Sequence, residues 1–145
     1  MQLSLALFLG CVLLQAQARP PKLIDCHVHH NGQKAFLVVS EQEDFDKVFG
    51  AAARMGQNHF LPKDAFESKF VVTAIKSSNS LRKYSDVKVT AKDGNLYVWY
   101  TATDGKPGSA TFISPLVLAL DKNEYQEIIF MENDKKVAML KITGK

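Results

Sequence analysis

The sequence lacks the features that mark most enzymes and cofactor-binding proteins. Its single lysine between glycines, at Gly105–Gly108, lacks the spacing and the Lys-Ser/Thr end of a phosphate-binding loop. Its serines and carboxylates form no recognisable hydrolase pattern. The net charge is only +3, and the basic residues are spread along the chain instead of forming a stripe that could follow phosphates. Catalysis and nucleic-acid binding are therefore not expected.

The first eighteen residues have the pattern of a secretory signal peptide. Residues 2–14 carry no charged side chain, and an Ala-x-Ala site at 16–18 predicts cleavage after Ala18. The apolar stretch is shorter than the about 20 residues that a membrane span needs, and no later segment reaches that length. A bacterial lipoprotein with Cys11 as the lipidated residue is the alternative, although Phe8-Leu9-Gly10 matches that signal poorly. Either way the protein is expected to be secreted or periplasmic.

Removing residues 1–18 from the 145-residue chain leaves 127, which suits one domain. We expect residues 19–33 to form an N-terminal lead-in and a His-rich strand, and residues 34–145 to form a single domain. Cys26 is then the sole cysteine, so no internal disulfide can form. A lone cysteine in an exported protein is buried and inert, paired to another chain, or reactive.

Residues 87–120 organise the predicted fold as three strands joined by two turns. An Asp93-Gly94 step between alternating apolar runs is a strong hairpin signal, and Gly105–Gly108 forms the second turn. Within 96–103 the side chains alternate between two faces, and neither face is charged. This pattern predicts a central strand covered on both sides.

One helix is expected near residue 40. Ser40 and Glu43 have the spacing of a capping box. Apolar residues then recur at helical spacing, and Gly56 is a plausible end. The stripe that should pack on the sheet consists of Phe45, Val48, Phe49, Ala52 and Met55.

Further strands are predicted at 70–76, at 125–132 and at 137–143, the last two joined around Asn133–Lys136. Ser114-Pro115 interrupts the third central strand, where proline indicates an edge, a bulge or a break. The predicted fold class is α+β, with a mostly antiparallel sheet of about seven strands and one amphipathic helix packed on it.

Four short motifs follow one another between residues 34 and 120. They are Glu41–Phe49 on the helix, Asp64-Ala65-Phe66 before the Phe70-Val71-Val72 strand, Tyr84-Ser85 before Val87–Thr90, and Ser114-Pro115 before Leu116-Val117-Leu118. In the order and spacing of these motifs, residues 34–120 resemble the PrcB-like domain family of protease-complex accessory lipoproteins. Two departures are Arg82-Lys83, where the family has Gly-Gly, and Leu116, where it has an aromatic residue.

The resemblance implies a non-enzymatic exported domain that binds or steadies another exported protein, with a protease among the candidates. It supplies no catalytic residue. The departure at Arg82-Lys83 affects the loop before Tyr84, so the shape of any binding surface there is open. Exposed loops near Ser77–Lys83 and Thr103–Gly108 are the expected contact surfaces, because rigid sheets commonly present function on loops.

The residues Asp25 to His30 form the sharpest local cluster of side chains that can bind a metal. On one strand, Asp25, His27 and His29 would share a face, with the two imidazoles about 6–7 Å apart, and could hold zinc or copper. Cys26 and His30 would lie on the other face. The alternative is a polar strand with solvated histidines.

Three further alternatives concern chemistry elsewhere in the chain. Cys26 could act as a nucleophile with the remote His59, but no third group is identifiable. Tyr84, Tyr97 and Trp99 are either core residues or a platform on which bases or sugars stack. A small-ligand carrier with a pocket between helix and sheet is the last alternative.

The metal hypothesis is testable by calorimetry. We expect the double substitution His27→Ala and His29→Ala to abolish zinc or copper binding, since it removes both imidazole ligands. If the unsubstituted protein shows no detectable binding at micromolar metal, the hypothesis is wrong.

Overall fold

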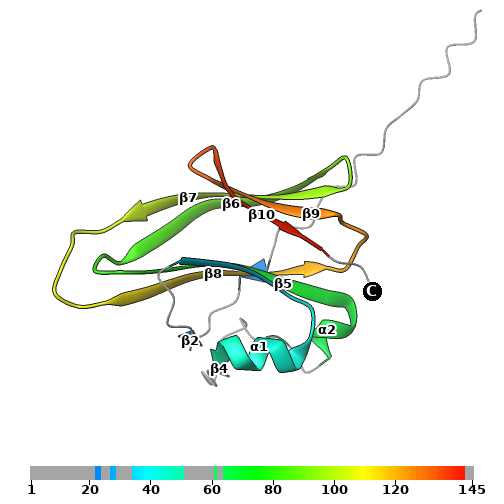
Figure 1. Cartoon of the computed structure of the whole chain (residues 1–145), viewed down its shortest axis with the longest axis horizontal. Helices are drawn as coiled ribbons and strands as arrows, with labels where there is room; N and C mark the ends of the chain where they lie inside the picture. The colour runs from blue at the N-terminus through cyan, green and yellow to red at the C-terminus, as the bar shows by residue number, and fades with distance from the viewer. Residues whose placement is uncertain (1–21, 24–26, 29–33, 51–60, 62–63, 143–145) are drawn as a thin grey trace, which may run out of the picture.

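The computed structural model describes residues 22–23, 27–28, 34–50, 61 and 64–142 (Figure 1). Within them, two four-stranded sheets dominate. The inner sheet has the order β1 (Lys22–Leu23), β8 (Phe112–Asp121), β5 (Lys69–Ser78) and β3 (Lys34–Val39). The outer sheet has the order β10 (Lys135–Lys141), β9 (Glu127–Glu132), β7 (Asn95–Asp104) and β6 (Arg82–Lys92). All neighbouring strands are antiparallel except β7 and β9, which are parallel.

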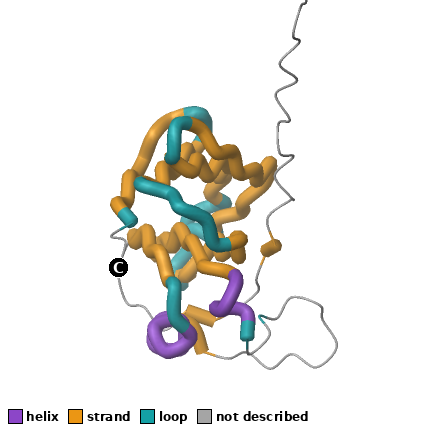
Figure 2. Tube along the Cα trace, turned by 90° about the vertical axis from the view of Figure 1, so that its right-hand side faces the viewer, coloured by secondary structure: helices purple, strands orange, loops and turns teal. Residues whose placement is uncertain are grey.

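Three short elements complete the described structure. Helix α1 (Gln42–Val48) runs into β4 (Phe49–Gly50), which pairs with β2 (His27–Val28), and α2 (Ala65–Ser68) precedes β5. Figure 2 shows both helices on the same side of the strands, and Figure 1 shows that this side belongs to the inner sheet. The molecule therefore has three layers: helices, inner sheet and outer sheet.

Two apolar cores hold the layers together. The core between the sheets is built from alternate residues of four strands, among them Val72, Val98, Leu118 and Phe130. The second core lies between the inner sheet and the helices and contains Phe45, Phe49, Phe66, Val71, Ile75 and Val117. Strand β5 contributes to both cores, and its six residues from Phe70 to Ile75 are all buried. An apolar run without alternation is typical of a strand covered on both faces.

The predicted single sheet of about seven strands is wrong, although the α+β class and the mostly antiparallel pairing are confirmed. After the loop that follows β7, the chain crosses to the inner sheet, and β8 pairs with β5 over its full length. The reason is the composition of β8. Its residues from Leu116 to Leu120 are buried on both faces, which only the middle layer provides.

The helix prediction is right in position and wrong in detail. Helix α1 begins at Gln42 after the N-cap Glu41, and no side chain caps it, so the capping box of Ser40 and Glu43 does not form. The helix ends at Val48 because the backbone of Phe49 becomes extended. Phe45 and Phe49 are buried as predicted. Ala52, Met55 and Gly56 lie outside the described residues, and α2 is a second helix where only one was expected.

Two of the three predicted turns join paired strands, whereas the segment at Gly105–Gly108 leads from β7 to the other sheet. Asp93 and Gly94 have φ values of 53° and 78°, the positive values that a two-residue turn between twisted strands favours. Asn133 and Asp134 make the second turn with φ values of 50° and 63°. Each turn sets the register of its two strands.

Pro115 lies within the continuous strand β8, at a point where β8 forms an edge of the inner sheet. It is opposite Ile75 of β5, and β1 pairs only with Leu118 and Ala119 on the other side of β8. The described residues therefore place no strand beside Pro115 on that other side. A missing N–H on that side removes no hydrogen bond between strands. Of the three outcomes that the sequence allowed, the structure has the edge.

The packing of Phe49 can be tested by substitution. We expect Phe49→Ala to lower the free energy of unfolding by about 3–5 kcal/mol, because the ring is fully buried against Phe45 at a centroid distance of 4.9 Å. Denaturant unfolding measures the change. Ile113→Ala, at a side chain that is 39% exposed, is the control and should cost less than about 1 kcal/mol. Equal effects of the two substitutions would contradict the packing.

Candidate functional site

A cluster of ionic groups joins the two sheets near the end where β6 begins. Arg82 donates two hydrogen bonds to the carboxylate of Asp104, at 2.8 and 3.1 Å, and a third to Glu132 at 2.9 Å. Lys76 of the inner sheet donates to the same Asp104 at 2.9 Å. The guanidinium is only 9% exposed, so pairing from both sides offsets its desolvation. Arg82 stands where the resembled family has glycine, and here it ties strands together.

Two tyrosines complete this cluster. Tyr100 donates to Glu132 at 3.1 Å, and Tyr84 donates to the backbone carbonyl of Ser114 at 2.8 Å. Burial raises the pKa of Tyr84 to about 12. Burial, followed by the nearby charge of Glu132, raises the pKa of Tyr100 well above its usual range. Both phenols therefore keep their protons at neutral pH and act as hydrogen-bond donors.

The same cluster controls the charge of Asp104. Its pKa is lowered mainly by the hydrogen bonds from Arg82 and then by those from Lys76. A carboxylate with a depressed pKa stabilises the folded state above its unfolded pKa, about 3.9, and loses that contribution as the pH falls. The cluster is thus complete from mildly acidic to neutral conditions.

The cluster has no space for a substrate. A surface depression is lined by Phe36, Ile75, Lys76, Arg82, Tyr84, Tyr100 and others, but it has no internal volume that a water molecule could occupy. Every ionic group in it already has a partner. The arrangement joins the sheets and leaves no group free for acid–base work.

The two loops predicted as contact surfaces lie side by side. The amide of Gly105 donates to the carbonyl of Leu81 at 2.8 Å, and that of Gly108 donates to Asn79 at 2.9 Å. Leu81 and Ile113 are exposed here, at 47% and 39%. The loops therefore form one surface at the left-hand end of Figure 1.

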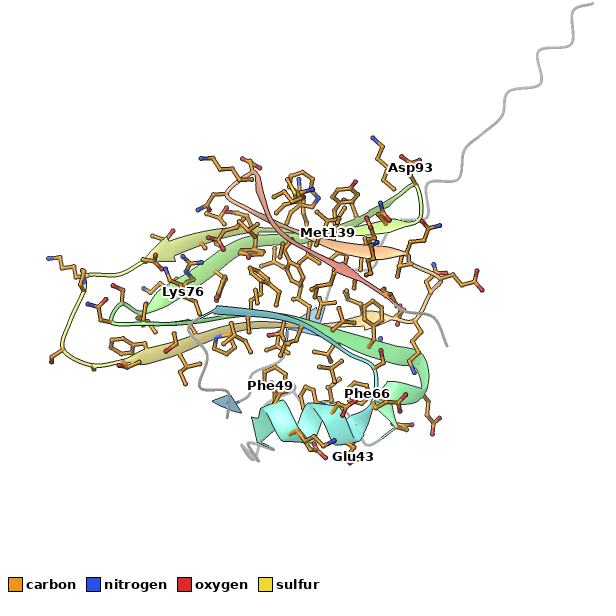
Figure 3. All side chains as sticks on the ribbon, in the orientation of Figure 1. Glu43, Phe49, Phe66, Lys76, Asp93 and Met139 are labelled. Carbon is orange, nitrogen blue, oxygen red and sulfur yellow. The ribbon has the colours of Figure 1, made fainter. Side chains whose placement is uncertain are left out.

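The outer face of the outer sheet is a second exposed surface, which the sequence analysis missed. Because Leu96, Val98 and Tyr100 point into the core, Tyr97 and Trp99 point away from it. No described helix or strand covers this side, on which Figure 3 labels Met139, whereas Phe49 and Phe66 lie under the helices. The prediction that this strand is covered on both sides is therefore wrong.

The sequence contained one signal for this surface. Strand β9 reads Glu-Ile-Ile-Phe-Met-Glu, with apolar residues on both faces. Ile128 and Phe130 enter the core, and the register of β9 with β7 places Ile129 beside Tyr97 and Met131 beside Trp99. When a strand carries apolar side chains on both faces and one face is partly exposed, the exposed face indicates an interaction site.

The three aromatic residues considered as a platform separate onto two faces. Tyr97 and Trp99 stack with ring centroids 6.3 Å apart and an interplanar angle of 24°. Tyr84 points into the sandwich, edge-on to Tyr100 at 5.7 Å. The half-buried Tyr97 and Trp99 remain as an outer pair, and Tyr84 is a core residue.

The predicted metal ligands are not brought together by the described residues. Asp25, His29, Cys26, His30 and His59 lie outside them, and only the backbone of His27 is placed, opposite Gly50. Lys22–Leu23 pairs with β8 and His27–Val28 pairs with β4, and the face that Asp25, His27 and His29 would share lies outside the described residues.

The described part of the chain contains neither a cluster of metal ligands nor a membrane-spanning helix. No group of three or more His, Cys, Asp or Glu is arranged to hold a metal ion there. Nor does any described helix have the length and apolar character to cross a membrane.

Comparison with protein-family models, with curated proteins and with solved structures gives no match to this chain. The resemblance of residues 34–120 to the PrcB-like family therefore stays a prediction. Two of its motifs meet in space, since Tyr84 bonds to Ser114.

The role of Arg82 as a clamp can be tested with a mutant cycle. We expect Arg82→Met to lower the free energy of unfolding by about 3–5 kcal/mol, because it leaves the Glu132 carboxylate, 13% exposed, without its cation. Adding Glu132→Gln removes that charge and keeps an acceptor for Tyr100, so at least half of the loss should return.

The control for this cycle is Lys69→Met, which breaks a more exposed ion pair with Asp121. It should cost less than about 1 kcal/mol in the same denaturant measurement. If Glu132→Gln adds to the loss instead of relieving it, the pairing is not what Arg82 contributes.

Proposed function

We propose that this chain is a non-enzymatic exported domain that binds another exported protein. The observation that carries the proposal is the outer face of the outer sheet, which no described helix or strand covers. Around the buried Ile129 it presents Tyr97, Trp99 and Met131 half-buried and Met139 46% exposed. Aromatic residues and methionine are enriched in protein interfaces, and a contiguous exposed apolar patch marks an interaction site.

The interior supports binding over catalysis. The ionic cluster around Arg82 is internally paired, and the depression beside it is too shallow to enclose a water molecule. The space between α1 and the inner sheet is occupied by Phe45, Phe49 and Phe66. The ring centroid of Phe45 lies 4.9 Å from that of Phe49 and 5.6 Å from that of Phe66. This packing disfavours the small-ligand carrier with a pocket at that place.

The nature of the partner rests on the family resemblance. A PrcB-like domain associates with an exported protease complex, so a protease is the first candidate. The contact between Tyr84 and Ser114 supports the resemblance because two motifs thirty residues apart join β6 to β8. The signal-peptide pattern at residues 1–18 supports an exported location.

Affinity capture with matched variants tests this function. The purified chain is immobilised and exposed to the exported fraction of its own organism, with and without chelator. We expect one dominant protein to be retained in both conditions, and the retention to fall about tenfold for Trp99→Ser with Met139→Ser, because apolar anchors near an interface centre carry much of the affinity.

The control is Leu81→Ser with Ile113→Ser, which removes two exposed apolar side chains from the loop surface. Full retention by this control and loss by the outer-face variant support the proposal. Loss by the control alone would move the contact to the loops. Retention of no protein, or only of a protein released by chelator, would refute the function as stated.

A further inference from the structure

The outer face has a regular pattern that specifies the partner more closely. Strand registers align its side chains in three rows that run from β6 across β7 and β9 to β10. The rows are Lys88, Trp99, Met131 and Lys136; Thr90, Tyr97, Ile129 and Met139; and Lys92, Asn95, Glu127 and Lys141. The inference drawn from them rests on the proposed function.

The rows divide the face into a centre and a rim. In the first two rows the central strands β7 and β9 contribute only aromatic and apolar side chains, and all four lysines of the three rows lie on the edge strands β6 and β10. Four lysines, Lys88, Lys92, Lys136 and Lys141, are exposed at the ends of these rows. Interfaces have the same anatomy, with aromatic residues and methionine at the centre and charge at the rim.

The charge on this face is predominantly positive. Against the four lysines, the rows contain a single carboxylate, Glu127. Among the described residues, no ion pair engages any of the four lysines, whereas Lys76 and Arg82 in the cluster are paired. A surface of this kind attracts and orients an acidic partner.

The aromatic centre is held in place before any partner arrives. Trp99 donates from its indole N–H to the hydroxyl of Thr90 at 3.0 Å, across to the neighbouring strand. The ammonium of Lys88 lies 5.3 Å from the Trp99 ring centroid, and the ring of Tyr97 stacks with the ring of Trp99. Such a ring loses little conformational freedom on binding, which favours affinity.

Two register shifts create this arrangement. In β6, Asp86 has a φ of 52° and the pairing slips between Ser85 and Lys88, so that Tyr84 and Val87 both contact the core. The shift turns Lys88 and Thr90 to the outer face. In β10 a second shift lies between Lys136 and Ala138. Bulges commonly redirect side chains at functional surfaces.

We propose that this face binds an acidic protein segment whose apolar side chains contact Tyr97, Trp99 and Met131 while its carboxylates pair with the flanking lysines. A protein segment is favoured over an anionic membrane because the tryptophan is held by Thr90 and does not project as a wedge. It is favoured over single-stranded nucleic acid because thioether and aliphatic side chains, which provide no stacking face, share the centre with the rings.

Tryptophan fluorescence of the unlabelled chain can measure this binding. Trp99 is the only tryptophan, so intrinsic fluorescence comes from the middle of the proposed surface. The probe is a twelve-residue peptide of alternating Glu and Leu, titrated into the full chain near neutral pH. We expect saturable change in Trp99 emission, weakened as salt rises, and no such change with the Lys-Leu or Glu-Ser peptide of the same length.

A matched pair of charge reversals tests the lysines. Lys88→Glu and Lys106→Glu change the net charge equally, and both side chains are exposed, but Lys106 lies in the loop after β7. We expect Lys88→Glu to weaken peptide binding about tenfold and Lys106→Glu less than about twofold. Circular dichroism should show both variants folded, since neither lysine has a described ion-pair partner.

Several outcomes would overturn the inference. Equal binding of the Lys-Leu peptide would exclude charge selection. An emission change with phosphatidylglycerol vesicles or with oligo(dT), but not with the Glu-Leu peptide, would assign the face to membrane or nucleic acid. If the captured exported protein is lost with Trp99→Ser but unaffected by Lys88→Glu and by salt, the acidic-partner inference fails while the proposed function stands.

Discussion

Burial of the inner sheet on both faces is the constraint on which this structure depends. Six consecutive residues of β5 and five of β8 are removed from water; six of these eleven belong to the core against the outer sheet and four to the core against the helices. Burial of apolar area at about 25 cal/mol per Å² makes the middle layer the main source of stability. The helices and the outer sheet are each required because the middle layer has two faces to cover.

This constraint leaves the outer sheet with one face that no described helix or strand covers. The chain passes between the sheets after β5, after β7 and after β8, and the short segments at those crossings are tied by Gly105 to Leu81 and by the Arg82 cluster. The ionic cluster and the core therefore share one task, which is to hold the sheets together. The surface that no described element covers is the one for which we propose binding.

The free face is also an aggregation hazard that the edges reduce. An exposed edge strand can pair with another chain, and lysines and bulges oppose such pairing. Strands β6 and β10 have both, with register shifts beside Lys88 and Lys136. The same lysines surround an aromatic centre that edge protection does not require. Protection of the edges and selection of an acidic partner are thus compatible uses of one charge pattern.

Most of the strands, two of their turns and the side chains that share a face follow from local sequence. Alternation in 96–103, the Asp93-Gly94 step and the β-branched stretch of 70–76 depend on local backbone geometry, so they could be predicted. The local sequence did not determine that β8 leaves β7 for β5, that Tyr97 and Trp99 stay uncovered, or that Arg82 is buried between two carboxylates. Those features depend on contacts between residues far apart in sequence, such as Ile75 with Pro115 and Arg82 with Glu132. These long-range contacts contribute free energy only when all three layers are assembled. For this reason they could not be predicted from the local sequence.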